Sequence, residues 1–319
     1  MDTTRTSADS DDATAKWSTW LHWAIGIAVV AALAYLLWPK GNDSAARVLQ
    51  EQTQAARKLQ EDTARSLGLP REEVLDLGGG IALKLSLIPP GRFTMGSPSS
   101  EDGRQDIEAP HQVTITRSFY MSATEITRRQ WRAVVEGQTE AIPGESMPQE
   151  SVPWSGAVEF CRRLSEKAQR VVRLPTEAQW EYACRAGTTT AFWFGDSMHP
   201  DRAAFDATYR YGDAPKGRRR SEASPVGSFD HNAWGLFDMH GNAWEWCSDW
   251  LGEYPSEALT DPTGPPTGSR RVLRGGAWSR GPDMARSARR DACAPGDPYP
   301  VCGFRIVVEP KPPPPTTAN

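Results

Sequence analysis

The chain has 319 residues, of which 39% are hydrophobic and 24% are charged, so it has the composition of a globular protein. Its length is sufficient for one large domain or two ordinary ones. The formal net charge of -4 is small and mixed in sign, which gives no indication of nucleic-acid binding.

Residues 17–38 are predicted to form a single transmembrane helix after a polar tail over residues 1–16. Only Ser18, Thr19 and His22 interrupt the apolar run. At a rise of 1.5 Å per residue it reaches about 33 Å, enough to cross a hydrocarbon core of about 30 Å. The alternative is a cleaved signal peptide, but the preceding tail is acidic and no small-x-small cleavage site follows. Basic residues on both sides leave the orientation of the globular body open, although their count favours a cytoplasmic body.

Residues 39–72 are predicted to be a helical stalk. The stretch from Asn42 to Leu67 is rich in Ala, Gln, Glu and Arg, and Asp43 or Ser44 can serve as its amino cap. Its apolar positions are sparse, which favours a solvated helix that holds the body off the membrane. The alternative is self-association of this helix as a coil.

From residue 73 to residue 309 the composition is that of a globular domain, with short apolar segments separated by Gly, Pro and Asp. Two segments alternate as strands do and two have helical spacing: Leu83–Pro89 and Gln112–Met121, then Ile126–Glu136 and Ser155–Gln169. Thr176 is predicted to cap a further helix, with Gln179 completing a capping box. Residues 310–319 are predicted to be a solvated Pro-rich tail, because such composition cannot bury a core.

The segment Gly235–Trp250 concentrates unusual residues. It holds three of the thirteen tryptophans, the acidic residues Asp238 and Glu245, and the turn formers Gly241 and Asn242. Neither strict alternation nor a 3.6-residue stripe fits it. We therefore predict an irregular, tryptophan-packed turn whose backbone is shaped to hold something.

Seven motifs occur in a fixed order: Phe93–Ser97, Glu125–Thr127, Arg173–Tyr182, Pro225–Gly227, Gly241–Trp246, Arg274–Trp278 and Gly303–Arg305. Together they resemble the formylglycine-generating enzyme family, also called sulfatase-modifying factor proteins. The resemblance covers about residues 80 to 308. It implies a single α+β domain of the C-type-lectin-like kind, with little regular secondary structure.

The resemblance gives the segment Gly235–Trp250 a role, because the corresponding loop of the family looks like a calcium site. The ligands that it implies are the side chains of Asp238 and Glu245 and the carbonyls of Met239, Gly241 and Ala243. Hard oxygen ligands of this kind suit Ca²⁺. The alternative is that the two acids satisfy buried backbone donors. A second calcium site of the family is not expected, because Ala204 stands where an amide is needed.

The family's copper chemistry is not expected in this chain. Family oxidases look like copper(I) enzymes that use two cysteines shortly after an Arg-Gly-Gly-Ser motif. Here the segment Arg274–Arg290 contains no cysteine, and Ala277 replaces the serine. Cys293 and Cys302 lie beyond the arginine cluster and fit neither copper position.

The remaining cysteines and histidines indicate no other metal centre. Cys161 and Cys184 stand where relatives have disulfide cysteines, but the partner positions near Ser287 and Ile306 are not cysteine, so the resemblance implies buried thiols. No pair of histidines has metal-ligand spacing, and His240 is expected to be a packed or solvent-facing side chain.

Two classes of function remain. The first is an enzyme, or an accessory protein derived from one, that acts on a cysteine or other residue of a protein substrate. The second is a membrane-displayed module that binds a protein or peptide. The segment 279–302 lies between two scaffold motifs, a layout that resembles the variable proteins of diversity-generating retroelements. Its candidate contact residues are Ser279, Arg280, Asp283, Asp291, Cys293, Asp297, Tyr299 and Val301.

The arginines within this segment, Arg286, Arg289 and Arg290, are expected to be structural and paired with acids beneath the surface. We favour a membrane-anchored family member without oxidase activity that serves recognition or an accessory role. A lineage-specific loop in an inactive family member is the alternative.

Overall fold

The computed structural model describes residues 41–297 and 299–311. The predicted transmembrane helix at 17–38, the tail before it and residues 312–319 lie outside the described residues. Across the described ranges, no helix combines the length and the apolar character needed to cross a membrane. Contacts along the chain separate residues up to Val48 from a compact unit that begins at Leu49.

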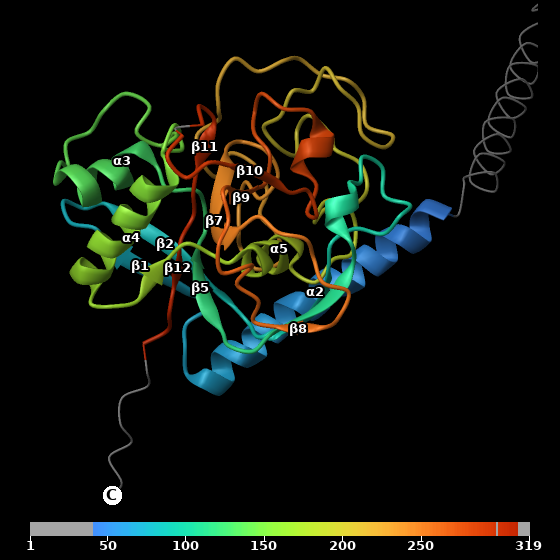
Figure 1. Cartoon of the computed structure of the whole chain (residues 1–319), viewed down its shortest axis with the longest axis horizontal. Coiled ribbons are helices and arrows are strands. Elements are labelled where there is room, and N and C mark those ends of the chain that lie inside the picture. The colour runs from blue at the N-terminus through green and yellow to red at the C-terminus, as the bar shows by residue number, and fades with distance from the viewer. Residues whose placement is uncertain (1–40, 298, 312–319) are drawn as a thin grey trace, which may run out of the picture. The chain divides into compact units, whose positions relative to one another are not determined.

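Three sheets form the framework of this unit (Figure 1). The largest is antiparallel, in the order β1 (Glu72–Asp76), β2 (Ala82–Ile88), β5 (Phe119–Ser122), β12 (Val307–Val308) and β6 (Val172–Arg173). The second has the order β10 (Asp291–Cys293), β9 (Arg271–Arg274), β7 (Trp244–Trp250) and β11 (Cys302–Gly303), with β11 parallel to β7. The third consists of β3 (Gly91–Met95), β4 (His111–Ile115) and β8 (Leu259–Thr260).

Helices are interleaved with these strands, so the domain mixes helices and sheets as the α+β prediction requires. They are α2 (Gly41–Leu67), α3 (Arg128–Trp131), α4 (Trp154–Ala168) and α5 (Glu177–Arg185), with the short turns η1 (Asp106–Glu108), η2 (Arg132–Glu136) and η3 (Pro282–Ala285). The capping box predicted at Thr176 is confirmed. The Gln179 N–H donates to Thr176 Oγ1 and the Thr176 N–H donates to Gln179 Oε1, both at 3.1 Å.

The helix α2 corrects the prediction of a free stalk. Its residues from Leu49 onward pack on the domain, with Ala56 and Ala64 buried. The Gln60 amide donates to the Leu87 carbonyl at 2.8 Å, and the Trp234 indole donates to the Ala56 carbonyl at 3.0 Å. The stalk prediction is therefore wrong for residues 49–67. The polar composition of the helix did not indicate this packing, because the buried side chains of residues 49–67 include alanines and an amide but no large apolar side chain.

Two further segments differ from their predicted form. Gln112–Met121 is not one strand but parts of β4 and β5, which belong to different sheets. The segment Gly235–Trp250 is irregular only in its first half, since Trp244–Trp250 forms the strand β7. Both faces of β7 are mostly buried, so its sequence lacks the alternation by which a half-buried strand is recognised.

Candidate functional site

The irregular half of Gly235–Trp250 is a buried loop with a demanding backbone. Asp238 and Asn242 both have positive φ, at 55° and 62°. At Gly241, with φ of 88°, a Cβ would lie 2.1 Å from the Ala204 carbonyl oxygen. Only glycine can occupy that position, and the loop is therefore held in one close approach to residue 204.

Glu245 is fully buried and its carboxylate is already paired. Arg305 donates from Nε to Oε2 at 2.6 Å and from Nη2 to Oε1 at 2.7 Å, and the Trp180 indole donates to Oε2 at 2.6 Å. Arg305 is fully buried as well. For Glu245 the structure thus agrees with the alternative to calcium binding, in which the acid satisfies buried donors. These donors belong to side chains and not to the backbone.

Asp238 differs, because one of its oxygens is unpaired. Its Oδ2 accepts the Gly227 N–H at 2.6 Å, whereas Oδ1 is buried without a partner among the described residues. Glu125 is similar: Oε1 accepts from the Asn242 amide at 2.9 Å, and Oε2 has no partner in the same described part of the chain. Burial raises the pKa of Asp238 to about 6 and that of Glu125 well above its ordinary value.

The three carboxylates of Glu125, Asp238 and Glu245 share one counter-ion, Arg305. The surplus negative charge is relieved when a proton or a cation binds at the two bare oxygens. Within residues 41–297 and 299–311, no three His, Cys, Asp or Glu side chains form a metal-binding group. A cation here would rest on Asp238 and on loop carbonyls, with Glu245 already bound by Arg305. Of the two side-chain ligands that the resemblance implies, only Asp238 keeps a bare oxygen, and Glu125 supplies the second one.

The segment 279–302 combines exposed and half-buried candidate side chains with buried arginines. All eight candidate contact residues are exposed or half-buried, whereas Arg286, Arg289 and Arg290 are buried. Arg286 pairs with Glu108 at 2.8 Å and with Glu101 at 2.6 Å. Arg290 is bidentate to Glu177 at 2.7 and 2.8 Å. The prediction of acid-paired arginines is confirmed for these two.

Arg289 lacks such a pair. Its Nε finds no hydrogen-bond partner in the described structure, and burial lowers the pKa of its guanidinium. Arg274 of β9, by contrast, is fully buried beneath the segment and donates to the carbonyls of three successive residues: Ser287 at 2.7 Å, Ala288 at 3.0 Å and Arg289 at 2.8 Å. Arg274 therefore holds the backbone of residues 287–289 in place.

The structure brings some candidate contact residues together. Arg280 Nη2 donates to the Tyr299 hydroxyl at 2.5 Å. Cys293, Tyr299 and Val301 pack against the same core cluster. Asp283, in η3, lies beside Gly103, since a Cβ built on that glycine would be 3.1 Å from the Asp283 Cβ.

The described cysteines are all free thiols. Burial raises the pKa of Cys161 and Cys184 to about 12 and that of Cys247 and Cys302 well above its ordinary value. Because the thiolate is the form that binds metals, these thiols are poor ligands at neutral pH. His240 is packed, as predicted: Nδ1 donates to the Ala285 carbonyl at 2.7 Å, Nε2 accepts the Trp193 N–H at 3.0 Å, and burial lowers its pKa to about 3.

Cys184 lies next to Ser287, close to the position where the resemblance implies a disulfide partner in relatives. Its Sγ is 3.7 Å from Ser287 Oγ, and both side chains are fully buried. We expect Ser287→Cys to form a disulfide with Cys184 on oxidation, seen by mass spectrometry as a loss of about two mass units. Because the bridge closes a long loop, oxidation should raise the free energy of unfolding by about 2–4 kcal/mol. Two free thiols in the oxidised variant would contradict this, and Ser287→Ala controls for loss of the hydroxyl.

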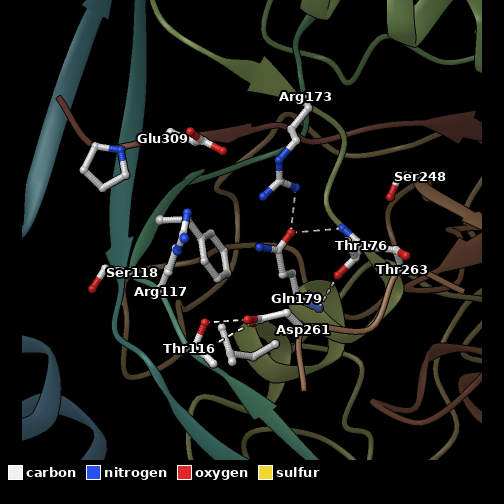
Figure 2. A pocket seen from close by; sticks show the side chains of 13 residues that line it. Thr116, Arg117, Ser118, Arg173, Thr176, Gln179, Ser248, Asp261, Thr263 and Glu309 are labelled. Atoms are coloured by element: carbon white, nitrogen blue, oxygen red, sulfur yellow. Dashed lines mark hydrogen bonds between the residues drawn. The ribbon is translucent and has the colours of Figure 1, made fainter. Parts of the chain in front are cut away.

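A separate polar pocket of about 540 Å³ opens between the turn after β4, the strand β6 and the start of α5. Figure 2 shows the Arg173 side chain reaching across it to Gln179, whose Oε1 accepts from Arg173 at 2.7 Å and from the Thr176 N–H. At its far side Asp261 accepts from the backbone N–H of Thr116 at 2.9 Å. These polar groups brace the capping box of α5 and the β4–β8 contact.

The order of the motifs and this fold agree with comparisons to known proteins. Residues 82–310 match the sulfatase-modifying factor enzyme 1-like domain. The chain belongs to this family.

Two curated proteins are similar to this chain in sequence. The formylglycine-generating enzyme of Bos taurus is 29% identical over 253 residues, which is 61% of this chain and 66% of the relative. The serine/threonine-protein kinase Pkn1 of Chlamydia trachomatis is 34% identical over 279 residues, which is 78% of this chain and 41% of the relative. The domain thus spans less than two thirds of these relatives' lengths.

Two solved structures share the fold of the sulfatase-modifying factor domain. Treponema denticola variable protein 1 superposes with a TM-score of 0.65 at 24% identity, over 76% of this chain and all of that one. PvdO from Pseudomonas aeruginosa gives a TM-score of 0.63 at 27% identity, over 75% of this chain and 98% of that one.

Two residues of the buried acid cluster were not singled out from the sequence. Glu125 and Arg305 both lie within family motifs, Glu125–Thr127 and Gly303–Arg305. The motifs identified the fold, but only the structure shows that these side chains meet Asp238 and Glu245. A signal was available, because a buried acid-rich loop needs a cation from elsewhere in the chain.

Proposed function

We propose that the chain is a membrane-anchored recognition module of the sulfatase-modifying factor family that binds a protein or peptide through the segment 279–302. The observation that carries this proposal is the division of that segment. Its candidate contact side chains are exposed or half-buried, while Arg286 and Arg290 between them are buried in ion pairs. A surface whose side chains can be substituted while buried ion pairs hold its backbone in place suits ligand binding.

The nature of the thiols supports recognition over oxidation of a substrate cysteine. Copper(I) needs two accessible thiolates, whereas Cys302 is fully buried and its thiol pKa is raised. We therefore expect no aldehyde in a Cys-x-Pro-x-Arg peptide incubated with the purified protein, copper and oxygen. Mass spectrometry measures this, with an active family oxidase as the positive control. An aldehyde product that depends on the protein would refute the proposal.

A retroelement-type variable protein is the more specific form of this proposal. The likeness to Treponema denticola variable protein 1 supports it at the level of the fold. It predicts a near-copy of the coding segment for residues 274–305 beside a reverse transcriptase gene. If neither the copy nor the gene is found in the genome, this form is wrong and the general recognition role has to be tested on its own.

Membrane anchoring by residues 17–38 is part of the proposal and rests on their composition and length. The full-length chain should remain in the membrane pellet after carbonate extraction. A chain that begins at residue 41 should appear in the supernatant. Equal extraction of both forms would contradict anchoring by this segment.

Calcium at the Asp238 loop is the remaining proposal, and the bare oxygens of Asp238 and Glu125 support it. Calcium should raise the melting temperature of the protein relative to excess chelator, by an amount equivalent to about 2–3 kcal/mol at a hundredfold excess over Kd. Asp238→Ala should abolish this rise, whereas Glu166→Ala, which removes an exposed acid of α4, should not. An unchanged melting curve in the unmutated protein would instead assign the surplus charge to a bound proton.

A further inference from the structure

A second pocket, of about 420 Å³, lies between the start of α5, the end of β7 and the loop over residues 252–265. Its walls are largely apolar and include the rings of Trp250 and Tyr254 and three prolines: Pro255, Pro262 and Pro265. Its volume is in the range of pockets that hold small organic molecules. None of the eight candidate contact residues of segment 279–302 lines it.

Asp249 presents an unpaired oxygen to this pocket. The side chain is 3% exposed, and its Oδ2 accepts the Glu177 N–H at 3.1 Å and the Ser248 hydroxyl at 2.8 Å. Oδ1 has no partner within the described structure. A Cβ on Gly264, which has φ of 72°, would lie 3.3 Å from Oδ1 and 2.9 Å from Asp249 Cβ. The glycine therefore leaves this oxygen uncovered on its pocket side.

His111 presents a second unpaired acceptor. Its ring is 5% exposed and lies against Tyr254, with ring centroids 4.7 Å apart. Nδ1 is 3.1 Å from the Ala109 carbonyl and donates to it, which leaves Nε2 as an acceptor without a partner among residues 41–297 and 299–311. Asp249 and His111 thus line one pocket, and each has an acceptor atom that reaches solvent and makes no hydrogen bond to the described residues.

Two acids of the pocket take no part in an ion pair within the described structure. Glu177 and Arg290 pair with each other, and the Tyr254 hydroxyl also donates to Glu177 at 2.9 Å. Asp249 inside the pocket and Glu253 at its exposed rim have no ion pair among the described residues, although the charges of Arg290 and Arg271 act on Asp249. A ligand that carries several N–H donors and a positive charge would satisfy both lone acceptors, and its apolar part would contact the prolines and the aromatic rings.

We propose that this pocket binds a protonated primary amine carried on an apolar body, with the ammonium at Asp249 Oδ1 and His111 Nε2. The chemistry is shared by a free organic amine and by a lysine side chain presented by a peptide. The proposal is independent of the recognition role of segment 279–302. It would stand if that role failed.

Isothermal titration calorimetry of the full-length protein tests it with three ligands of matched shape: tryptamine, indole-3-ethanol and indole-3-acetate. Tryptamine is expected to bind at least tenfold more tightly than the neutral alcohol, and the anion is expected not to bind. The peptide acetyl-Trp-Lys-amide, compared with acetyl-Trp-Gln-amide, distinguishes the sources. Tighter binding of the lysine peptide than of tryptamine assigns the pocket to a protein partner, and the reverse assigns it to a small molecule.

Asp249→Asn is the decisive variant, because an amide oxygen can still accept from Glu177 and Ser248 while the charge is lost. It should weaken tryptamine binding at least tenfold. Glu253→Gln, at the exposed rim, should weaken it about threefold and cannot disturb the core. Glu166→Gln, an exposed acid on α4, is the matched control and should change nothing. Equal binding of tryptamine and indole-3-ethanol, or unchanged binding to a folded Asp249→Asn variant, would overturn the proposal.

Discussion

Arg305→Met is expected to lower the free energy of unfolding by about 3–5 kcal/mol, the cost of removing one partner from a buried ion pair. Arg305 satisfies both oxygens of Glu245 and also donates to the carbonyls of Ser122 and Phe237, each at 3.0 Å. Its loss leaves Glu125, Asp238 and Glu245 without a counter-ion in the core. Because domains are stable by only about 5–15 kcal/mol, this loss would remove a large part of the stability of the domain.

Urea denaturation and melting temperature measure this effect. The matched control is Arg162→Met on α4, whose side chain is 54% exposed and pairs with Glu159 and Glu166 on the surface. Such exposed pairs contribute less than about 1 kcal/mol. The double variant Arg305→Met with Glu245→Gln should recover part of the loss, because no unpaired charge remains at position 245. Equal stabilities of Arg305→Met and Arg162→Met would show that the core pair has no structural role.

Asp249→Asn is expected to stabilise the protein at pH 8 and to leave it nearly unchanged at pH 4. Burial, with the neighbouring charge of Glu177, raises the pKa of Asp249 to about 7 from its ordinary 3.8. A carboxyl with a raised folded pKa costs no stability below its unfolded pKa, and the cost grows as pH rises from about 4 to about 7. Each pKa unit corresponds to about 1.4 kcal/mol, so the full cost approaches about 4 kcal/mol.

The amide cannot ionise and therefore avoids this cost. Allowing for relaxation around the pocket, we expect a gain of about 1–3 kcal/mol at pH 8, measured as the difference in urea unfolding between the variant and the unmutated protein. The same comparison at pH 4 is the internal control. A variant that is less stable at both pH values would mean that the carboxylate form is favoured in the folded state.

The sequence predicted the elements whose side chains alternate or cap in an orderly way. The helix spacing of Ser155–Gln169 matches α4, and the Thr176–Gln179 capping box is present as expected. Local patterns of this kind depend on neighbours in the chain, so they can be recognised without the fold. The family motifs supplied the rest of the fold class.

Contacts between distant segments were beyond the same reasoning. Ala56 and Gln60 of α2 gave no apolar stripe, yet they pack on the domain because small and hydrogen-bonding side chains allow close approach. The pairing of Glu245 with Arg305 joins residues 60 positions apart. The pocket acceptors at His111 and Asp249 are still farther apart, so their meeting follows from tertiary structure alone.

The hydrogen bonds from Arg274 to three successive carbonyls limit which sequence changes the segment 279–302 can accept. Because one guanidinium donates to the backbone oxygens of Ser287, Ala288 and Arg289, these three residues must keep their positions in the chain. Exchanging a side chain upstream leaves those oxygens where they are, whereas inserting or deleting one residue close to them moves each oxygen off its donor. Substitutions in this part of the protein should therefore be tolerated better than the insertion or deletion of one residue.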